Sequence, residues 1–125
     1  MATILVVEDE PTIREMVCEL VGANHYCLCF RTAEEALEAL ARAPADVIVT
    51  DVKLPGMDGV ELMRRALELR PELPVILISG GYGYDEVTYE EEGAFGYLLK
   101  PFQAEELEEL VARALGRSGG DGVTR

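Results

Sequence analysis

Several short apolar segments of this sequence end at residues whose side chains could take part in chemistry. The first segment leads into Glu8 and Asp9, a later one into Asp51, and two more into Ser79 and Lys100. The segment before Asp51 is rich in β-branched residues, which is typical of a strand covered on both faces. An isolated aspartate at a strand end would more often face solvent or cap a turn. If the strands are parallel, however, all these residues meet at one edge, where open α/β sheets bind ligands.

The types of these residues indicate the chemistry that such an edge could support. Three carboxylates placed together repel one another and raise one another's pKa values. A hard divalent cation removes that conflict, and Mg²⁺ accepts one or two carboxylates while it keeps water and phosphate oxygens as ligands. Lys100 adds a second positive charge and Ser79 adds a hydroxyl donor. This combination suits a phosphoryl group better than a carbohydrate or a peptide.

The elements that must position these residues alternate regularly between strand and helix. Apolar runs predict strands over residues 3–7, 26–30, 47–51, 75–79 and 95–99. A helical spacing of apolar residues follows each run, and the short second strand is expected near an edge of the sheet. Five such alternations predict a single doubly wound α/β domain, with a parallel sheet and helices on both faces.

Local signals mark where the helices begin. Thr32 and Glu35 have the form of a capping box, and Asp58 can cap the helix that follows Asp51. The helix expected near residues 85–92 is the weakest, because Val87 and its tyrosines form a poor apolar stripe, and it follows a glycine-rich loop over residues 80–84. Its low apolar content makes it a candidate for mobility.

Composition narrows the class of protein. The chain has 125 residues, which suits one domain, and its formal net charge is −13. Because phosphate backbones reward lysine and arginine, this charge argues against direct binding of nucleic acid. No apolar run approaches the roughly 20 residues that a membrane span needs, and no basic leader opens the sequence. A cytoplasmic protein without membrane contact is therefore expected.

The three cysteines are Cys18, in a helical pattern, and Cys27 and Cys29, two residues apart on a predicted strand. An odd number without a small disulfide-rich layout predicts reduced, partly buried thiols. The Cys-x-Cys pair could bind a metal only with further ligands, and His25 is the sole histidine. A structural role is preferred.

The order of these features resembles a known family. Glu8-Asp9, Asp51, the Leu-Pro-Gly-Met-Asp-Gly segment at residues 54–59, Ser79 and Lys100-Pro101-Phe102 are similar to the receiver domain of bacterial two-component response regulators, of the CheY-like superfamily. The likeness covers residues 3–116, so residues 1–116 are interpreted as the receiver domain and residues 117–125 as a flexible tail. The resemblance implies a flavodoxin-like sheet of five strands in the order 2-1-3-4-5, flanked by five helices.

The resemblance also implies roles for the residues at the sheet edge. Asp51 would accept a phosphoryl group from a phosphohistidine of a sensor histidine kinase or phosphotransfer protein. Mg²⁺ would be held by Asp9, by Asp51, by Glu8 through water and by the backbone carbonyl of Lys53. Lys100 would pair with the phosphoryl oxygens, aided by a cis peptide bond to the proline that follows it.

A switch is implied as well. Ser79 would turn toward the phosphoryl group, and Tyr97, three residues before Lys100, would move from an exposed to a buried position. Tyr97 could equally be an ordinary half-buried strand tyrosine. A domain of this kind catalyses only its own phosphorylation and dephosphorylation, so it is not classed as an enzyme. Its cognate kinase, its downstream protein target and any phosphorylation-dependent dimer are left open.

Some positions depart from the family pattern. Glu8 stands where aspartate is commoner, so its longer arm could alter the water-mediated contact with the metal. Lys53 places a cation near the acceptor, where it could screen the carboxylates and alter the phosphoryl lifetime. Gly80 and Gly81 leave room beside Ser79 for water or a phosphatase. The polar helix after that loop suggests an atypical switch face.

Three other readings compete. A haloacid-dehalogenase-like phosphatase would need an aspartate where Lys53 stands. A dinucleotide-binding loop built on Gly81 and Gly83 would follow the first strand and continue to a third glycine, but Glu86 occupies that place. A pseudo-receiver that binds proteins without being phosphorylated is the remaining alternative.

Overall fold

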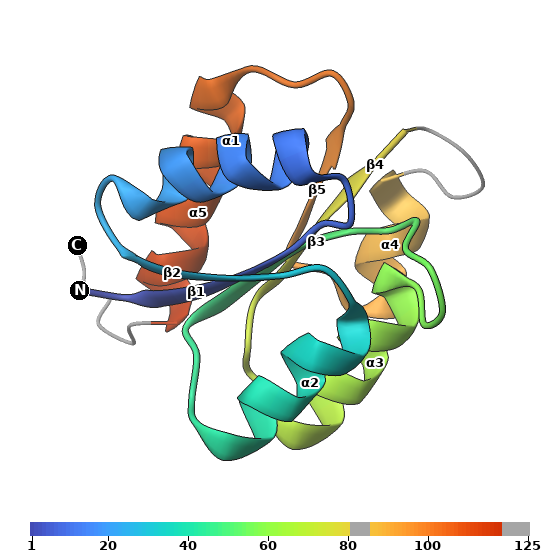
Figure 1. The fold of residues 1–125 in the computed structure, drawn as a ribbon. Coiled ribbons are helices and arrows are strands. Elements are labelled where there is room, and N and C mark those ends of the chain that lie inside the picture. The colour runs from blue at the N-terminus through green and yellow to red at the C-terminus, as the bar shows by residue number, and fades with distance from the viewer. Residues whose placement is uncertain (81–85, 119–125) are drawn as a thin grey trace.

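The structure is a computed structural model, and it describes residues 1–80 and 86–118. Strands and helices alternate along the chain (Figure 1). The strands are β1 (Thr3–Val7), β2 (Tyr26–Phe30), β3 (Val47–Asp51), β4 (Val75–Ser79) and β5 (Gly96–Leu99). The helices are α1 (Pro11–Gly22), α2 (Ala33–Arg42), α3 (Gly59–Leu69), α4 (Glu86–Glu92) and α5 (Ala104–Ser118).

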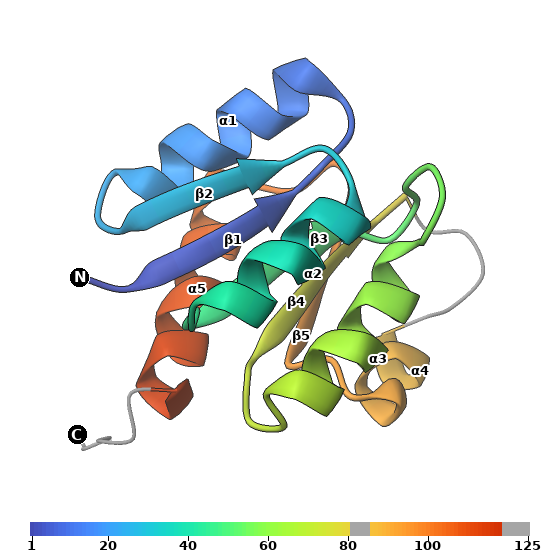
Figure 2. The same ribbon diagram turned by 60° about the horizontal axis from the view of Figure 1, so that its bottom comes forward.

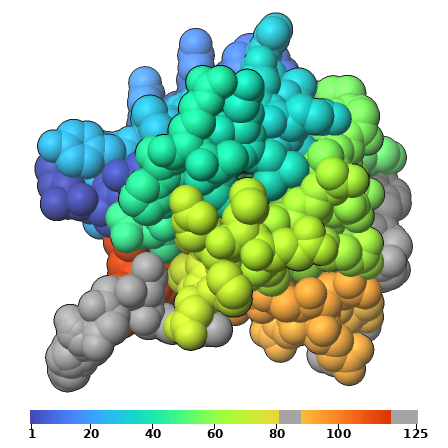
Figure 3. Space-filling model, turned by 90° about the horizontal axis from the view of Figure 1, so that it is seen from below, coloured from blue at the N-terminus to red at the C-terminus, as the bar shows by residue number. Residues whose placement is uncertain are grey.

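The strands form one parallel sheet in the order β2-β1-β3-β4-β5. This order confirms the flavodoxin-like sheet that the resemblance to the receiver family implied. Helices α1 and α5 cover one face of the sheet, and α2, α3 and α4 cover the other (Figures 1 and 2). The side chains of α2, α3 and α4 form a continuous outer surface (Figure 3).

Two hydrophobic cores lie on the two faces of the sheet, because alternate strand residues point in opposite directions. In β1, Leu5 and Val7 pack toward α2 and α3, whereas Ile4 and Val6 pack toward α1 and α5. The strands β3 and β4 are buried along their whole length. Such complete burial is what their unbroken β-branched and aliphatic runs predicted.

Strand β2 lies at the edge of the sheet, as the sequence predicted. Its side chains Tyr26 and Leu28 are 61% and 49% exposed.

The expectation of three reduced thiols is wrong in this structure, because Cys18 of α1 and Cys29 of β2 form a disulfide. Cys27 is the only free cysteine, since the chain has three. The sequence could not show that α1 lies over the edge strand.

The predicted helix caps are present. The hydroxyl of Thr32 accepts a hydrogen bond from the Glu35 backbone N–H at 3.1 Å, and the Asp58 carboxylate accepts one from Glu61 at 2.8 Å. Glu10 caps α1 in the same way, which the sequence reasoning missed. These caps satisfy backbone groups that would otherwise lack partners. They fix the starts of α1, α2 and α3, of which α1 and α3 follow the loops of the site.

Two predicted segments, the glycine-rich loop and the C-terminal tail, extend into residues that the structure does not describe. Most of the predicted glycine-rich loop, residues 81–84, lies outside the described residues. Helix α5 runs to Ser118, two residues beyond the predicted domain boundary, and residues 119–125 lie outside the description, so the flexible tail stays a prediction. Among the helices described here, none has the length and apolar character needed to cross a membrane.

Candidate functional site

Three carboxylates gather at the carboxyl edge of the sheet. Parallel pairing places Val7 beside Thr50, so the ends of β1 and β3 lie next to each other. Glu8, Asp9 and Asp51 each offer an oxygen within 4.8 Å of the others. Glu8 is 3% exposed and Asp51 is 5% exposed, whereas Asp9 faces solvent. The fold therefore brings together the acidic residues that the sequence singled out.

Lys100, at the end of β5, reaches across to these carboxylates. Its ammonium donates a hydrogen bond to Asp51 Oδ2 at 3.3 Å and lies 3.7 Å from Glu8 Oε1. The Lys100-Pro101 peptide bond is cis, as predicted. The structure thus pairs one lysine with two buried carboxylates that carry like charge.

Burial dominates the electrostatics of the two enclosed acids. It raises the pKa of Asp51, which Lys100 partly offsets by its charge and hydrogen bond. Burial likewise raises the pKa of Glu8, and the nearby charge of Asp51 raises it further against a hydrogen bond from the Glu10 backbone. One lysine does not compensate both carboxylates, so this group of oxygens suits an added hard cation.

The loop between β3 and α3 requires two glycines. Gly56 has φ +74°, and a Cβ there would meet Glu34, whose carboxylate accepts a hydrogen bond from the Met57 backbone at 3.2 Å. A Cβ on Gly59 would overlap the backbone carbonyl oxygen of Asp51. The close approach of the backbone to Asp51 excludes a side chain at Gly59, whereas at Gly56 it is the positive φ that disfavours one.

A cleft of about 710 Å³ opens above the carboxylates. Its lining includes Lys53, Gly80 and Lys100 together with the acidic cluster. The N-terminal end of α1 is tied to the same cleft, because the Arg14 guanidinium donates to the backbone carbonyl of Glu8 at 3.0 Å and to that of Asp9 at 3.5 Å. The cleft is large enough for a phosphoryl group with its waters.

Ser79 lies at the end of β4 and is 4% exposed. Its hydroxyl oxygen accepts a hydrogen bond from the Tyr89 hydroxyl at 3.4 Å. Tyr89, on α4, is fully buried, and its ring centroid lies 4.8 Å from that of Tyr97. Tyr97 is half-buried rather than fully exposed. The space between Ser79 and Tyr97 is therefore already occupied by a second aromatic ring.

Tyr89 is the residue of this region that the sequence reasoning missed. The sequence analysis interpreted the tyrosines of this helix as part of a poor apolar stripe, yet Tyr89 is one of the largest fully buried side chains among the described residues. The sequence did contain a signal for this burial. Tyr89 is followed by three glutamates, so it is the only large ring in residues 89–92 that could pack this part of the helix against the sheet.

The class of protein follows from comparison of this fold and site with known proteins. Residues 4–112 match the family described as the response regulator receiver domain. The chain is 40% identical over 112 residues to the DNA-binding transcriptional regulator NtrC of Escherichia coli, and 40% identical over 123 residues to the response regulator protein FleR of Pseudomonas aeruginosa. These matches cover 88% and 95% of this chain.

A solved structure agrees with this assignment. The response regulator receiver domain protein of Clostridium thermocellum superposes with a TM-score of 0.89 at 30% identity, covering 95% of this chain and 98% of that one. The chain belongs to the response regulator receiver domain family. It spans about a quarter of the length of the curated relatives, 24% of NtrC and 26% of FleR.

The two buried carboxylates, Glu8 and Asp51, which one lysine does not compensate, lead to a prediction for the stability of the metal-free protein. Because the folded state holds the protons of Glu8 and Asp51 more tightly than the unfolded chain does, the free energy of unfolding falls as pH rises from about 4 through the raised folded-state pKa values. We expect Asp51→Asn to raise that free energy at pH 7 by roughly 1 kcal/mol. Glu8 would remain as a partner for Lys100.

Urea unfolding in a chelator, at several pH values, measures this difference. The gain of the Asp51→Asn variant over wild type should shrink as pH falls toward 4, where Asp51 becomes protonated in both folded and unfolded wild-type chains. A variant less stable than wild type at pH 7 would contradict the electrostatic interpretation of the site.

Proposed function

We propose that this domain accepts a phosphoryl group on Asp51 from a phosphohistidine donor, with Mg²⁺ as cofactor, and so acts as the receiver of a two-component phosphorelay. The observation that carries the proposal is the convergence of two buried carboxylates, one exposed carboxylate and Lys100 at one sheet edge. Membership of the receiver family and the identities to NtrC and FleR support it.

The residues present fit Mg²⁺. Asp9 and Asp51 would supply carboxylate oxygens, Glu8 lies near enough to act through water, and Lys53, whose backbone carbonyl is the further ligand proposed, lines the same cleft. When bound, the ion would neutralise charge on the carboxylates and on the phosphoryl oxygens. The two buried acids with raised pKa values favour such a cation.

The transfer step needs a free carboxylate oxygen and a donor aligned with it. A carboxylate oxygen of Asp51 attacks phosphorus, the bond from phosphorus to the donor imidazole nitrogen breaks, and the electron pair leaves with that nitrogen. Lys100 Nζ then pairs with the phosphoryl oxygens in place of Asp51 Oδ2. Hydrolysis of the acyl phosphate returns the carboxylate, so the domain acts on itself and turns over no other substrate.

Phosphorylation is proposed to move the hydroxyl of Ser79 from Tyr89 to a phosphoryl oxygen. A charge-assisted hydrogen bond contributes roughly 1.5–3 kcal/mol. Reversing a two-state equilibrium from 1:99 to 99:1 needs about 5.5 kcal/mol. Ser79 alone is therefore insufficient, and movement of Lys100 and repacking of Tyr97 must contribute. Since Tyr89 fills the space beside Ser79, Tyr97 can move inward only when Tyr89 shifts.

Removal of the Tyr89 hydroxyl tests this arrangement. Tyr89→Phe keeps the buried ring but removes the donor to Ser79, so the phosphorylated conformation should form more readily. A lost neutral hydrogen bond of about 1 kcal/mol corresponds to a roughly fivefold larger population of that conformation. NMR of fluorotyrosine-labelled protein would follow Tyr97 at increasing phosphorylation. Tyr26→Phe, on the exposed edge strand, is the matched control. Equal populations in Tyr89→Phe and wild type would rule out a role for the Tyr89–Ser79 hydrogen bond in holding the unphosphorylated conformation.

Lys53 gives a second test of the site. Lys53 lines the cleft two residues after Asp51, and its charge is proposed to screen the carboxylates and affect the phosphoryl lifetime. We expect Lys53→Ala to change Mg²⁺ affinity or the dephosphorylation rate by about two- to threefold, because its charge is exposed and therefore largely screened by solvent. Titration with Mg²⁺ and decay of the acyl phosphate measure these. If both quantities stay at the wild-type values, the side chain has no such role.

The partners proposed are a sensor histidine kinase or phosphotransfer protein upstream and a protein target downstream, in the cytoplasm. Direct nucleic-acid binding by this domain is not proposed, because its net charge is −13.

The alternative function is that of a pseudo-receiver, which binds proteins without phosphorylation. Incubation of wild type with acetyl phosphate, with Mg²⁺ or with a chelator, separates the two by intact mass. The proposal predicts one added phosphoryl group only with Mg²⁺, whereas a pseudo-receiver gains none.

A further inference from the structure

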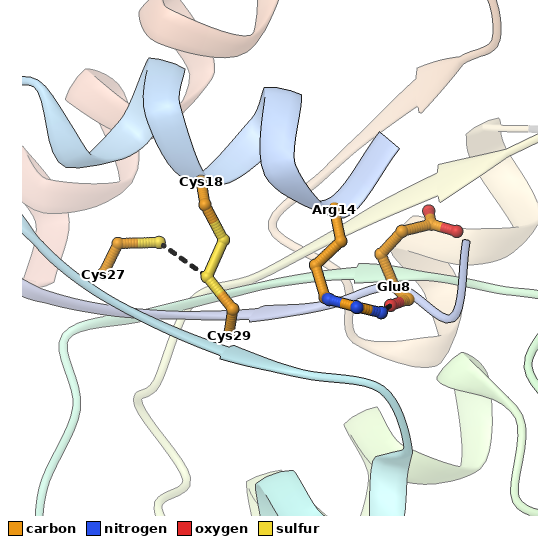
Figure 4. The surroundings of a disulfide bond; sticks show 5 residues. All are labelled: Glu8, Arg14, Cys18, Cys27 and Cys29. Atoms are coloured by element: carbon orange, nitrogen blue, oxygen red, sulfur yellow. Dashed lines mark hydrogen bonds between the residues drawn. A yellow bond between two sulfur atoms is a disulfide. The ribbon is translucent and has the colours of Figure 1, made fainter. Parts of the chain in front are cut away.

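Three cysteine sulfurs gather where α1 lies over the edge strand β2 (Figure 4). Cys27 and Cys29 are alternate residues of β2, so both point toward α1, from which Cys18 approaches. Cys18 and Cys29 form the disulfide, and the Sγ of Cys27 lies 3.6 Å from that of Cys29. All three sulfurs lie within 4.8 Å of one another. The sequence had no signal for this cluster, because Cys18 joins it only through the packing of α1.

The position of the disulfide makes it accessible and dispensable for folding. Cys29 is exposed on the outermost strand of the sheet, so a small oxidant or thiol can reach it. The two Cα atoms are 6.7 Å apart, within the range that a disulfide spans. The buried residues of the two hydrophobic cores are other side chains, and of this pair only Cys18 packs against a core. The domain can therefore keep its fold whether this bond is formed or broken.

We propose that Cys18 and Cys29 form a reversible redox modification site, oxidised by a peroxide and reduced by a dithiol. The thiolate of Cys29 attacks one oxygen of hydrogen peroxide, the O–O bond breaks, and a sulfenic acid forms while the leaving hydroxide takes up the proton lost by the thiol to give water. The thiol of Cys18 then attacks that sulfur, the S–S bond forms and a second water leaves. A dithiol reverses the reaction by exchange, taking up the bridge as its own disulfide and returning two thiols.

Cys27 is a neighbour of this pair and not a member of it. Burial raises the pKa of the Cys27 thiol to about 11, so almost none is thiolate at neutral pH. The thiolate is the species that attacks disulfides and alkylating reagents. Cys27 therefore leaves the adjacent bridge intact near pH 7, although it lies close to Cys29. Its alkylation should accelerate steadily as pH rises toward 11.

The disulfide acts on the helix that holds the acidic loop. Arg14 precedes Cys18 by one turn of α1 (Figure 4), and its guanidinium donates to the backbone carbonyls of Glu8 and Asp9. Fixing α1 to β2 keeps Arg14 in place, which lowers the cost of ordering the loop when a cation binds. The oxidised form should therefore bind Mg²⁺ about threefold more tightly than the reduced form. This consequence rests on the proposed function, whereas the redox pair itself does not.

Alkylation with mass detection tests the redox pair. Protein reduced by dithiothreitol and denatured should take up three alkyl groups, and protein treated with hydrogen peroxide first should take up one, mapped to Cys27. Dithiothreitol should restore three. Cys27→Ser should still form the bridge, whereas Cys18→Ser should not. A mapped peroxide product other than the Cys18–Cys29 bridge, or a reduced protein in which the three thiolates hold a zinc ion and resist peroxide, would overturn the proposal.

Titration of both redox forms with Mg²⁺ tests the link to the acidic loop. Cys27→Ser is used for both forms, so that exchange with a third thiol cannot interfere. A roughly threefold difference that disappears in the Cys18→Ser variant supports the link. Equal affinities of the oxidised and reduced forms would refute it. Failure of both forms to bind Mg²⁺ would count against the proposed function, and the alkylation result would stand independently.

Discussion

The Asp51→Asn variant should gain no phosphoryl group from acetyl phosphate and Mg²⁺, while wild-type protein gains one. The amide nitrogen and oxygen of asparagine carry no negative charge and do not attack phosphorus as a carboxylate does. Asp51 is also the carboxylate that Lys100 contacts at 3.3 Å, in the cleft above the carboxyl ends of the strands. Complete loss of modification, measured by intact mass, is therefore the largest effect expected of any single substitution.

A matched substitution in the same cleft makes this prediction specific. Asp58 lines the cleft and caps α3 by accepting a hydrogen bond from the Glu61 backbone. Asparagine caps helices about as well as aspartate, so Asp58→Asn should keep the fold. It should also keep phosphorylation near the wild-type level. Phosphorylation of Asp51→Asn to the wild-type extent would remove Asp51 from the role of acceptor.

The Lys100→Met variant should be phosphorylated roughly 100-fold more slowly than wild type, which is the loss typical when one group that stabilises a transferring oxyanion is removed. Lys100 is the cation that contacts both buried carboxylates among the ion pairs of the described chain. Its ammonium is placed to meet the phosphoryl oxygens as charge develops on them. The rate at saturating Mg²⁺, followed by mass or by radiolabelled donor, measures the effect.

Two further measurements separate catalysis from folding for this variant. Without Lys100, Glu8 and Asp51 lose their shared partner, so the metal-free variant should be less stable, and added Mg²⁺ should recover part of that loss. Lys53→Met removes a second cation from the same cleft and should slow phosphorylation by no more than about threefold. If Lys100→Met is folded in Mg²⁺ and reacts at the wild-type rate, the assigned role of Lys100 is wrong.

The features of the fold that the sequence predicted depend on local pattern. Unbroken apolar runs located all five strands, and the residues after those runs had to share an edge once the strands were parallel. Asp51, Ser79 and Lys100 therefore meet as expected without any knowledge of tertiary packing. The strand order came from family resemblance, because helix and strand alternation alone permits several orders.

The features that the sequence missed depend on contacts between distant segments. Tyr89 is far more buried than its polar helix suggests, because it reaches Ser79 and Tyr97 on neighbouring strands. Cys18 and Cys29 meet because α1 crosses the edge strand, which no spacing of two cysteines reveals. In both cases a single side chain contacts an element whose position is set by the whole sheet.

Chemical mapping of the acyl phosphate tests the central claim most directly. Protein treated with acetyl phosphate and Mg²⁺ is reduced with borohydride, which converts a phosphorylated aspartate to homoserine, and its peptides are sequenced by mass spectrometry. Homoserine at position 51, dependent on both donor and Mg²⁺, is the predicted result. Homoserine at position 9 or 58, or none in folded protein that binds Mg²⁺, would contradict the assignment of Asp51 as the phosphoacceptor.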